Sequence, residues 1–318
     1  MFNGLMNNSG RLLFWHTVVN LLIIFVVRRG VEAGTEKTIK VLMPMLFLAL
    51  IIMVIYGAIA GNMGAALKFM LEPDFSKVTV QTVMVAIGQA FFSIGIGMAV
   101  LITFGGYLPK NISIPGSVLT IVLVDTGVAL LAGFSIFALV FAYGLEPFSG
   151  SGLIFQTLPI AFGQMPGGQF FGAIFFVLLI AAALSSCIGC AEAVVSWVDE
   201  RWGIKREKGI LLTVGAAWAV GLLSIMSLGD WSEYYPLGFI SAFAEKTIFD
   251  ALDFLTANVL LLLSGLLTSI FFGWLVGKQL KLDELGVSEG TFFTFWHIMI
   301  RFVIPPVLLI SLVLDISE

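Results

Sequence analysis

The sequence predicts an all-α polytopic membrane protein, and three observations support this fold class. The 318 residues are 59% hydrophobic and only 11% charged, whereas soluble domains are about 25% charged. Mean hydropathy is +1.06. Apolar runs long enough to cross a bilayer, which takes about 20 helical residues, recur along the whole chain. We therefore expect a single transmembrane domain over residues 1–318, embedded in a lipid bilayer and without a soluble appendage.

Eight transmembrane segments follow from these apolar runs. The first, 12–27, is short. Several of the others exceed the length that spans hydrocarbon, which implies tilt, kinks or extension beyond the bilayer. The later segments cover residues 38–60, 80–107, 114–144, 169–198, 209–227, 249–277 and 291–314.

Lysine and arginine orient these segments. Eleven of the 16 lie in alternate loops on one side: Arg28, Arg29, Lys37, Lys40, Lys110, Arg201, Lys205, Arg206, Lys208, Lys278 and Lys281. The other side has Arg11, Lys68, Lys77 and Lys246. The positive-inside rule makes the richer side cytoplasmic, so both termini of a multi-pass plasma-membrane protein are expected outside. Residues 1–9 lack a secretory signal, and we therefore expect an internal start or a truncation.

Gly95 and Gly97 interrupt the third segment. Glycine loosens a helix because it has no Cβ to restrict the backbone, and broken membrane helices are typical of binding sites in secondary transporters. Close helix packing through Gly-x-Gly is the alternative. On the glycines alone, packing is the slightly stronger interpretation.

The fourth segment carries Asp125 about 18 Å from its start, at 1.5 Å per residue. A carboxylate at this depth costs at least about 2.5 kcal/mol, so it should face a cavity, a counter-ion or a partner. We favour an ion site over a protonated aspartate that ties two helices together. Sodium prefers oxygen ligands, and Ser93, just before the glycine break, has a hydroxyl to offer.

The fifth segment contains Ser185 and Ser186. Their hydroxyls can bond to carbonyls one turn earlier, or they can hold a cation together with the carbonyl of Ala182. The first interpretation is favoured on these residues alone. Cys187 and Cys190 are best explained as small packed residues rather than a redox pair. Glu192 lines an inner pathway or pairs with another helix, and the sequence leaves both open.

The remaining polar residues do not form a catalytic arrangement. Asp250 and Asp253 share a face at the outer end of the seventh segment, where Asp253 can close an entrance or simply be solvated. His16 and His297 lie in different segments without metal-ligand spacing, and Arg301 is expected to snorkel or pair. No nucleophile–base pair, phosphate loop or basic patch is present in the sequence, so we expect neither an enzyme nor a nucleic-acid partner, and no organic cofactor.

Five motifs in order resemble the neurotransmitter:sodium symporter family, over essentially the whole chain but only the later part of the family's sequence. They are residues 88–98 (GQAFFSIGIGM), 123–133 (LVDTGVALLAG), 157–162 (TLPIAF) followed by Gly167 and Gly168, 183–186 (ALSS) followed by Glu192 and 199–201 (DER), and 249–256 (FDALDFLT). The resemblance implies a partial inverted-repeat transporter fold with a broken helix near residues 95–97.

The resemblance also implies a role for each matching residue. Ser93 and Asp125 would bind the sodium beside the substrate, and Ala182, Ser185 and Ser186 the second sodium. Gln89 and Asp253 would belong to the outer gate. The substrate pocket would be lined by Phe92 as an aromatic lid and by Gly95, Gly97, Met98, Ser186 and Cys190.

These implications give an expected function: sodium-coupled symport of amino acids, hydrophobic or aromatic, by alternating access. Some relatives have a neutral residue at position 125 and use chloride, so the Asp125 carboxylate predicts chloride independence. The family's first three helices are missing, so this chain alone is expected to lack a complete site unless they are supplied in trans. The alternatives are a non-transporting remnant or accessory membrane subunit, and a proton-coupled carrier that uses Asp125 or Glu192.

Overall fold

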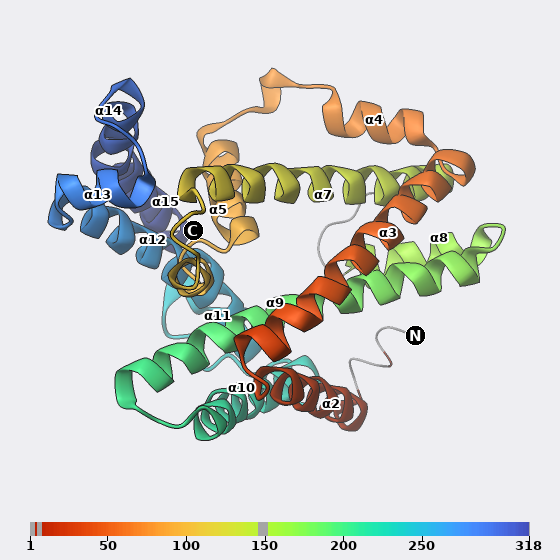
Figure 1. Ribbon diagram of the computed structural model, residues 1–318. Helices are drawn as coiled ribbons and strands as arrows, with labels where there is room; N and C mark the ends of the chain where they lie inside the picture. The colour runs from red at the N-terminus through yellow and green to blue at the C-terminus, as the bar shows by residue number, and fades with distance from the viewer. Residues whose placement is uncertain (1–3, 5–7, 146–151, 318) are drawn as a thin grey trace. The chain divides into compact units, whose positions relative to one another are not determined.

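A computed structural model describes residue 4 and residues 8–145 and 152–317. Within these ranges every regular element is helical (Figure 1). The expectation of an outward N-terminus rests partly on residues 1–3 and 5–7, which lie outside the described ranges.

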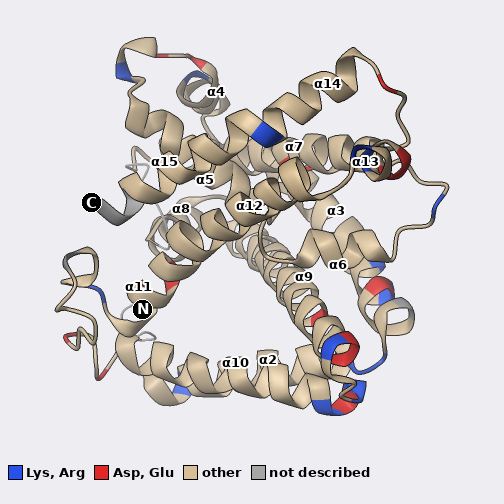
Figure 2. Cartoon of the chain, turned by 90° about the vertical axis from the view of Figure 1, so that its left-hand side faces the viewer, with Lys and Arg blue, Asp and Glu red and all other residues tan. Residues whose placement is uncertain are grey.

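Seven helical stretches of the described residues are long and apolar enough to cross a membrane: Ser9–Val27, Ala33–Ala60, Ile114–Ala142, Gly168–Trp202, Arg206–Leu228, Ile248–Leu275 and Thr291–Leu314. The remaining predicted segment, the third (80–107), is the broken one, and it consists of α5 (Val80–Ile94) and α6 (Val100–Gly106). Charged residues lie mostly in connecting segments and at helix ends (Figure 2). This distribution is what a bilayer requires, because a charge at its centre is costly.

The chain divides into two compact units that interleave along the sequence. Of the described residues, the first unit includes 17–77, 123–145 and 152–192, and the second includes 8–16, 78–122 and 193–317. Helices α2 (Ser9–Val27), α7 (Ile114–Ala142) and α9 (Gly168–Trp202) contribute residues to both units.

In the first unit, α3 (Lys37–Ala60) packs closely against α7. A Cβ built at Gly57 would lie 3.3 Å from the Ser135 carbonyl oxygen, and the Asn62 amide donates to the Ala138 carbonyl at 2.8 Å. Small residues allow this approach of two backbones, as in many membrane proteins. The unit also contains η1 (Val31–Glu36), α4 (Met63–Leu71), η2 (Phe75–Lys77), η3 (Leu153–Thr157) and α8 (Leu158–Gln164).

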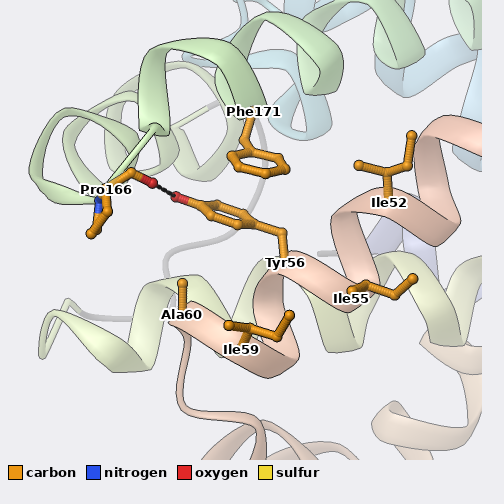
Figure 3. A pocket seen from close by; sticks show the side chains of 7 residues that line it. All are labelled: Ile52, Ile55, Tyr56, Ile59, Ala60, Pro166 and Phe171. Carbon is orange, nitrogen blue, oxygen red and sulfur yellow. Dashed lines mark hydrogen bonds between the residues drawn. The ribbon is translucent and has the colours of Figure 1, made fainter.

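Tyr56 joins α3 to the segment before α9. Its hydroxyl donates to the Pro166 carbonyl at 3.0 Å, and its ring stacks on Phe171 with centroids 3.6 Å apart (Figure 3). Beside it lies a cavity of about 600 Å³ lined by Ile52, Ile55, Tyr56, Ile59, Ala60, Pro166 and Phe171. This lining contains no carboxylate, so it is not where the predicted ion site belongs.

In the second unit, α12 (Leu261–Ile270) packs between α5 and α15 (Ile304–Ser317). A Cβ at Gly265 would lie 2.6 Å from Phe91 Cε1 and 3.5 Å from Leu308 Cδ1, and Leu308 is 1% exposed. The unit also holds α10 (Arg206–Leu228), η4 (Ser241–Phe243), α11 (Ile248–Phe254), η5 (Leu255–Leu260), η6 (Phe271–Leu275), α13 (Lys278–Leu285), α14 (Thr291–Ile298) and η7 (Met299–Val303). The π-helical turns η5 and η6 divide the seventh predicted segment, and η7 divides the eighth.

Candidate functional site

The third membrane segment is broken where the sequence predicts. Helix α5 ends at Gly95, which has the left-handed conformation with φ 75°. The amide of Gly95 donates to the Phe92 carbonyl and that of Ile96 to the Phe91 carbonyl, at 3.1 and 3.0 Å. These two bonds form a Schellman motif, which satisfies carbonyls at a helix end. A second glycine, Gly97, has φ 91° before α6 begins.

Gly97 also lies against α12. A Cβ at this position would be 2.8 Å from the Leu261 carbonyl oxygen and 3.3 Å from Ser264 Cβ. The structure thus shows both the helix break and the close packing: the segment is interrupted at the glycine pair, and Gly97 lets the break approach a neighbouring helix. The binding role of the break stays a prediction. Ala99, with φ 61°, is the one described non-glycine residue with positive φ. Backbone held in this region is strained by about 1–3 kcal/mol and is concentrated at functional sites.

A cavity of about 310 Å³ lies beside α5, one to two turns before the break. Its lining includes Gln89, Phe92 and Asp253, so the structure brings together three residues that the sequence predicted as gate or lid. The Phe92 side chain is 49% exposed. The cavity also contains Asn258 of η5, which the sequence analysis missed. The signal that could have identified Asn258 is its amide side chain, which is polar and lies inside the apolar run 249–277.

Two of the predicted sodium ligands of α9 bond to the third. Ser185 Oγ and Ser186 Oγ donate to the Ala182 carbonyl oxygen at 2.9 and 3.1 Å. Ser185 is buried and Ser186 is exposed. Three oxygens thus lie within one helical turn. Because the same bonds form in ordinary membrane helices, the sodium role of this cluster stays a prediction.

Glu192, which follows Ser185 and Ser186 along α9, forms a hydrogen bond with another helix. Its side chain has no exposed surface, and Oε2 accepts a hydrogen bond of 2.9 Å from Thr35 Oγ1 on η1. The structure therefore shows the pairing that was one of the two possibilities for Glu192. Thr35 itself was not predicted, since it lies in a polar loop by sequence. Cys187 and Cys190, one turn before, are both free thiols.

The other predicted ligands lie in different units. Asp125 is half-buried on α7 in the first unit, and Ser93 is in the last turn of α5 in the second. Met98 follows Gly95 within the break, and its amide donates to the Gly95 carbonyl at 3.3 Å. The pairing of Asp125 with Ser93 stays a prediction, as does the joint pocket of Phe92, Gly95, Gly97 and Met98 with Ser186 and Cys190.

Comparison with known proteins identifies the family of this chain. The model of the sodium:neurotransmitter symporter family matches residues 3–318. The chain belongs to this family. Its members are transporters, which agrees with the expectation that the protein is not an enzyme.

Among the relatives, an uncharacterized sodium-dependent transporter of Haemophilus influenzae is 34% identical over 306 residues, which are 95% of this chain and 65% of the relative. A second one, YhdH of Bacillus subtilis, is 34% identical over 313 residues, which are 98% of this chain and 68% of the relative. The chain thus spans about two thirds of the length of these relatives.

Among solved structures, that of MhsT in complex with L-phenylalanine is 33% identical to this chain, with a TM-score of 0.88 over 99% of this chain and 70% of MhsT. This likeness confirms the predicted transporter fold, including the all-α architecture and the interrupted helix. The membrane setting follows from the family and from the seven apolar spans.

Proposed function

We propose that this chain takes part in sodium-coupled symport of amino acids by alternating access. The observation that carries the proposal is the break at residues 95–99, because non-helical backbone at membrane depth is tolerated only where protein or a water-filled cavity satisfies it. Binding at such a break, near the bilayer midplane, is the general design of secondary transporters. The family match and the phenylalanine complex of MhsT support the same function.

The substrate is proposed to be a hydrophobic or aromatic amino acid. Gly95 and Gly97 have no side chains, and Met98 and Cys190 are apolar and adaptable, which leaves room for a large apolar group. Phe92 borders the cavity that also contains Gln89 and Asp253. Closure of this cavity over a bound substrate would separate it from the outside, with Phe92 as the lid and the two polar residues as the gate.

Sodium is proposed to bind in two places as a co-transported ion. Ser93 and Asp125 would hold the ion beside the substrate, and Ala182, Ser185 and Ser186 the second. For the second ion, the Ser185 and Ser186 hydroxyls would turn from donating to the Ala182 carbonyl, so that all three oxygens face the cation. Hydroxyl, carbonyl and carboxylate oxygens are the ligands that hard cations prefer.

Transport is proposed to be independent of chloride. A sodium ion that enters a low-dielectric site needs a nearby negative charge, because an unpaired charge in such a site is costly. The carboxylate of Asp125 is fixed to α7 and supplies this charge without a diffusible anion. Asp125→Asn is therefore expected to make uptake require chloride or to abolish it.

The test is uptake of labelled amino acids by proteoliposomes. It uses the 318-residue chain and a chimera in which this chain replaces the part of MhsT that it matches. A sodium gradient should drive uptake of phenylalanine or leucine by the chimera, a potassium gradient should not, and gluconate in place of chloride should change nothing. Uptake by the chain alone would contradict the expectation that it lacks a complete site.

A proton-coupled carrier is the second candidate, and the full burial of Glu192 within a membrane span is the observation that favours it. A buried carboxylate can carry a proton across a membrane protein. In the same assay, uptake driven by a pH gradient without sodium, and lost in Glu192→Gln, would replace the sodium proposal with this one.

A further inference from the structure

Basic side chains gather in the second unit around the η6 and η7 turns. Lys281 lies on α13, His297 on α14 and Arg301 on η7, and the charges of Lys278, Lys281 and Arg301 all act on His297. Of these four basic groups, Lys278 is the one with an ion pair among the described residues, to Glu289. Three basic groups thus lie close together without a described counter-charge.

Lys281 is the most buried of them. Lys281 is 5% exposed, and its Nζ donates to the Gly273 carbonyl at 3.4 Å. Burial and the nearby positive charge of Arg301 hold the pKa of Lys281 below its usual value. An ammonium has three N–H donors, and this long bond uses one of them.

Arg301 likewise has a donor without a hydrogen-bond partner among the described residues. Its guanidinium carbon lies 5.5 Å from the centre of the Trp274 ring and 5.3 Å from that of Phe302. Arg301 Nε and His297 Nδ1 are buried and have no hydrogen-bond partner within the described part of the chain. Buried polar atoms are nearly always bonded, so these two nitrogens need a partner beyond the described side chains. Each has less than 1 Å² of accessible surface, so a bound group reaches them only if the neighbouring side chains move.

The cluster lies at a membrane boundary. Gly273 is two residues before Leu275, where the span Ile248–Leu275 ends, and a Cβ at Gly273 would lie 3.2 Å from Arg301 Cα. Arg301 therefore packs against the end of that span, although it lies ten residues after the start of its own span, Thr291–Leu314. Trp274 is 46% exposed, and tryptophan is one of the two residue types enriched at membrane interfaces.

We propose that Lys281, Arg301 and His297 bind the phosphate of an anionic phospholipid headgroup. Basic pockets between membrane helices bind such headgroups, and a planar guanidinium can make two parallel hydrogen bonds to phosphate oxygens. A purely structural role explains less. A positive charge near the C-terminal end of a helix is favourable, and the Lys281 ammonium bonds to a carbonyl of η6. Arg301 lies over two aromatic rings. Neither contact provides a hydrogen-bond partner for Arg301 Nε or His297 Nδ1.

Thermal unfolding of the purified full chain in neutral detergent tests this site. Phosphatidylglycerol, phosphatidylcholine with the same acyl chains, and inorganic phosphate are titrated in parallel, since a ligand of the folded state raises the unfolding temperature by mass action. We expect phosphatidylglycerol to stabilise the protein more than phosphatidylcholine does, and inorganic phosphate to do so only weakly. Equal shifts with the two lipids would overturn the site, and an equal shift with inorganic phosphate would overturn the lipid assignment.

Variants locate the effect. Lys281→Met and Arg301→Gln should each weaken phosphatidylglycerol binding about five- to tenfold, whereas Lys110→Gln, which removes an exposed lysine elsewhere, should leave it unchanged. Lys281→Met is the safer variant, because an apolar group in place of a buried charge is often neutral or stabilising. A Lys281→Met protein that folds and retains the full preference for phosphatidylglycerol would contradict the proposal.

Discussion

At position 192 a carboxylate with no exposed surface lies inside a membrane-spanning helix, and the Thr35 hydroxyl donates to it at 2.9 Å. A buried acceptor that loses a donor costs more than the hydrogen bond contributes when it is made. The buried Glu192 carboxylate therefore makes the stability of the fold sensitive to a substitution at Thr35 in η1.

Thr35→Val is nearly isosteric and removes only the hydroxyl donor. We expect it to lower the free energy of unfolding by about 1–3 kcal/mol, measured by thermal or denaturant unfolding in detergent. Thr35→Ser keeps the donor and should lie close to the wild type. If valine were tolerated as well as serine, the Thr35–Glu192 bond would not stabilise the fold.

Lys281 predicts a pH dependence. Its pKa in the folded protein lies below the ordinary value of 10.5, through burial and the charge of Arg301. Between those two values the unfolded chain binds a proton that the folded chain does not, so the contribution of Lys281 to stability rises as pH is raised through this window. In detergent free of anionic lipid, the unfolding temperature of the wild type should rise relative to Lys281→Met over this alkaline range. Parallel curves would show that burial does not destabilise the ammonium.

At the scale of elements, the break between α5 and α6 has a different basis at each glycine. Gly95 provides the left-handed residue of a Schellman motif, and Gly97 combines φ 91° with a close approach to the Leu261 carbonyl. An alanine at Gly97 would need both an unfavourable backbone conformation and displacement of the Leu261 carbonyl at the start of α12. The break is therefore fixed by local conformation and by packing.

Gly97→Ala is expected to destabilise the protein by at least about 1–2 kcal/mol, the cost of the left-handed conformation alone. Gly88→Ala, in the middle of α5 with open space at its Cβ, should instead stabilise by about 0.5–1 kcal/mol because alanine is the better helix former. Unfolding of the two variants side by side provides the comparison. A Gly97→Ala protein as stable as Gly88→Ala would mean that the break can move.

The helices could be predicted because membrane spans need long apolar runs, and all eight predicted segments correspond to helices. The break was predictable because Gly95 and Gly97 fall in the middle of such a run. Side-chain pairing was not predictable: an apolar run gives the depth of a residue but not the direction that it faces. For this reason Glu192 was left open, and the contacts of Thr35, Lys281 and Asn258 were missed. The π-helical turns η5, η6 and η7 have no sequence signal of comparable strength.

At the scale of the whole molecule, symport requires that sodium and substrate bind differently to the outward- and inward-facing states. A ligand shifts a conformational equilibrium only by its difference in affinity for the two states. The proposed oxygen ligands belong to α5, α7 and α9, so sodium would bind more tightly to the state in which these oxygens lie close together. The occupancy of the ion sites would then control the population of each state.

Sodium binding to the MhsT chimera tests this account most directly, with the unfolding temperature measured in sodium against potassium at equal ionic strength. Sodium at 100 times its dissociation constant should stabilise the chimera by about 2.7 kcal/mol. Asp125→Asn should remove most of this effect, while Asp230→Asn, which changes an exposed loop acid, should retain it. Equal stabilisation by sodium and potassium, or a full sodium effect in Asp125→Asn, would contradict the claim that Asp125 holds a transported sodium ion.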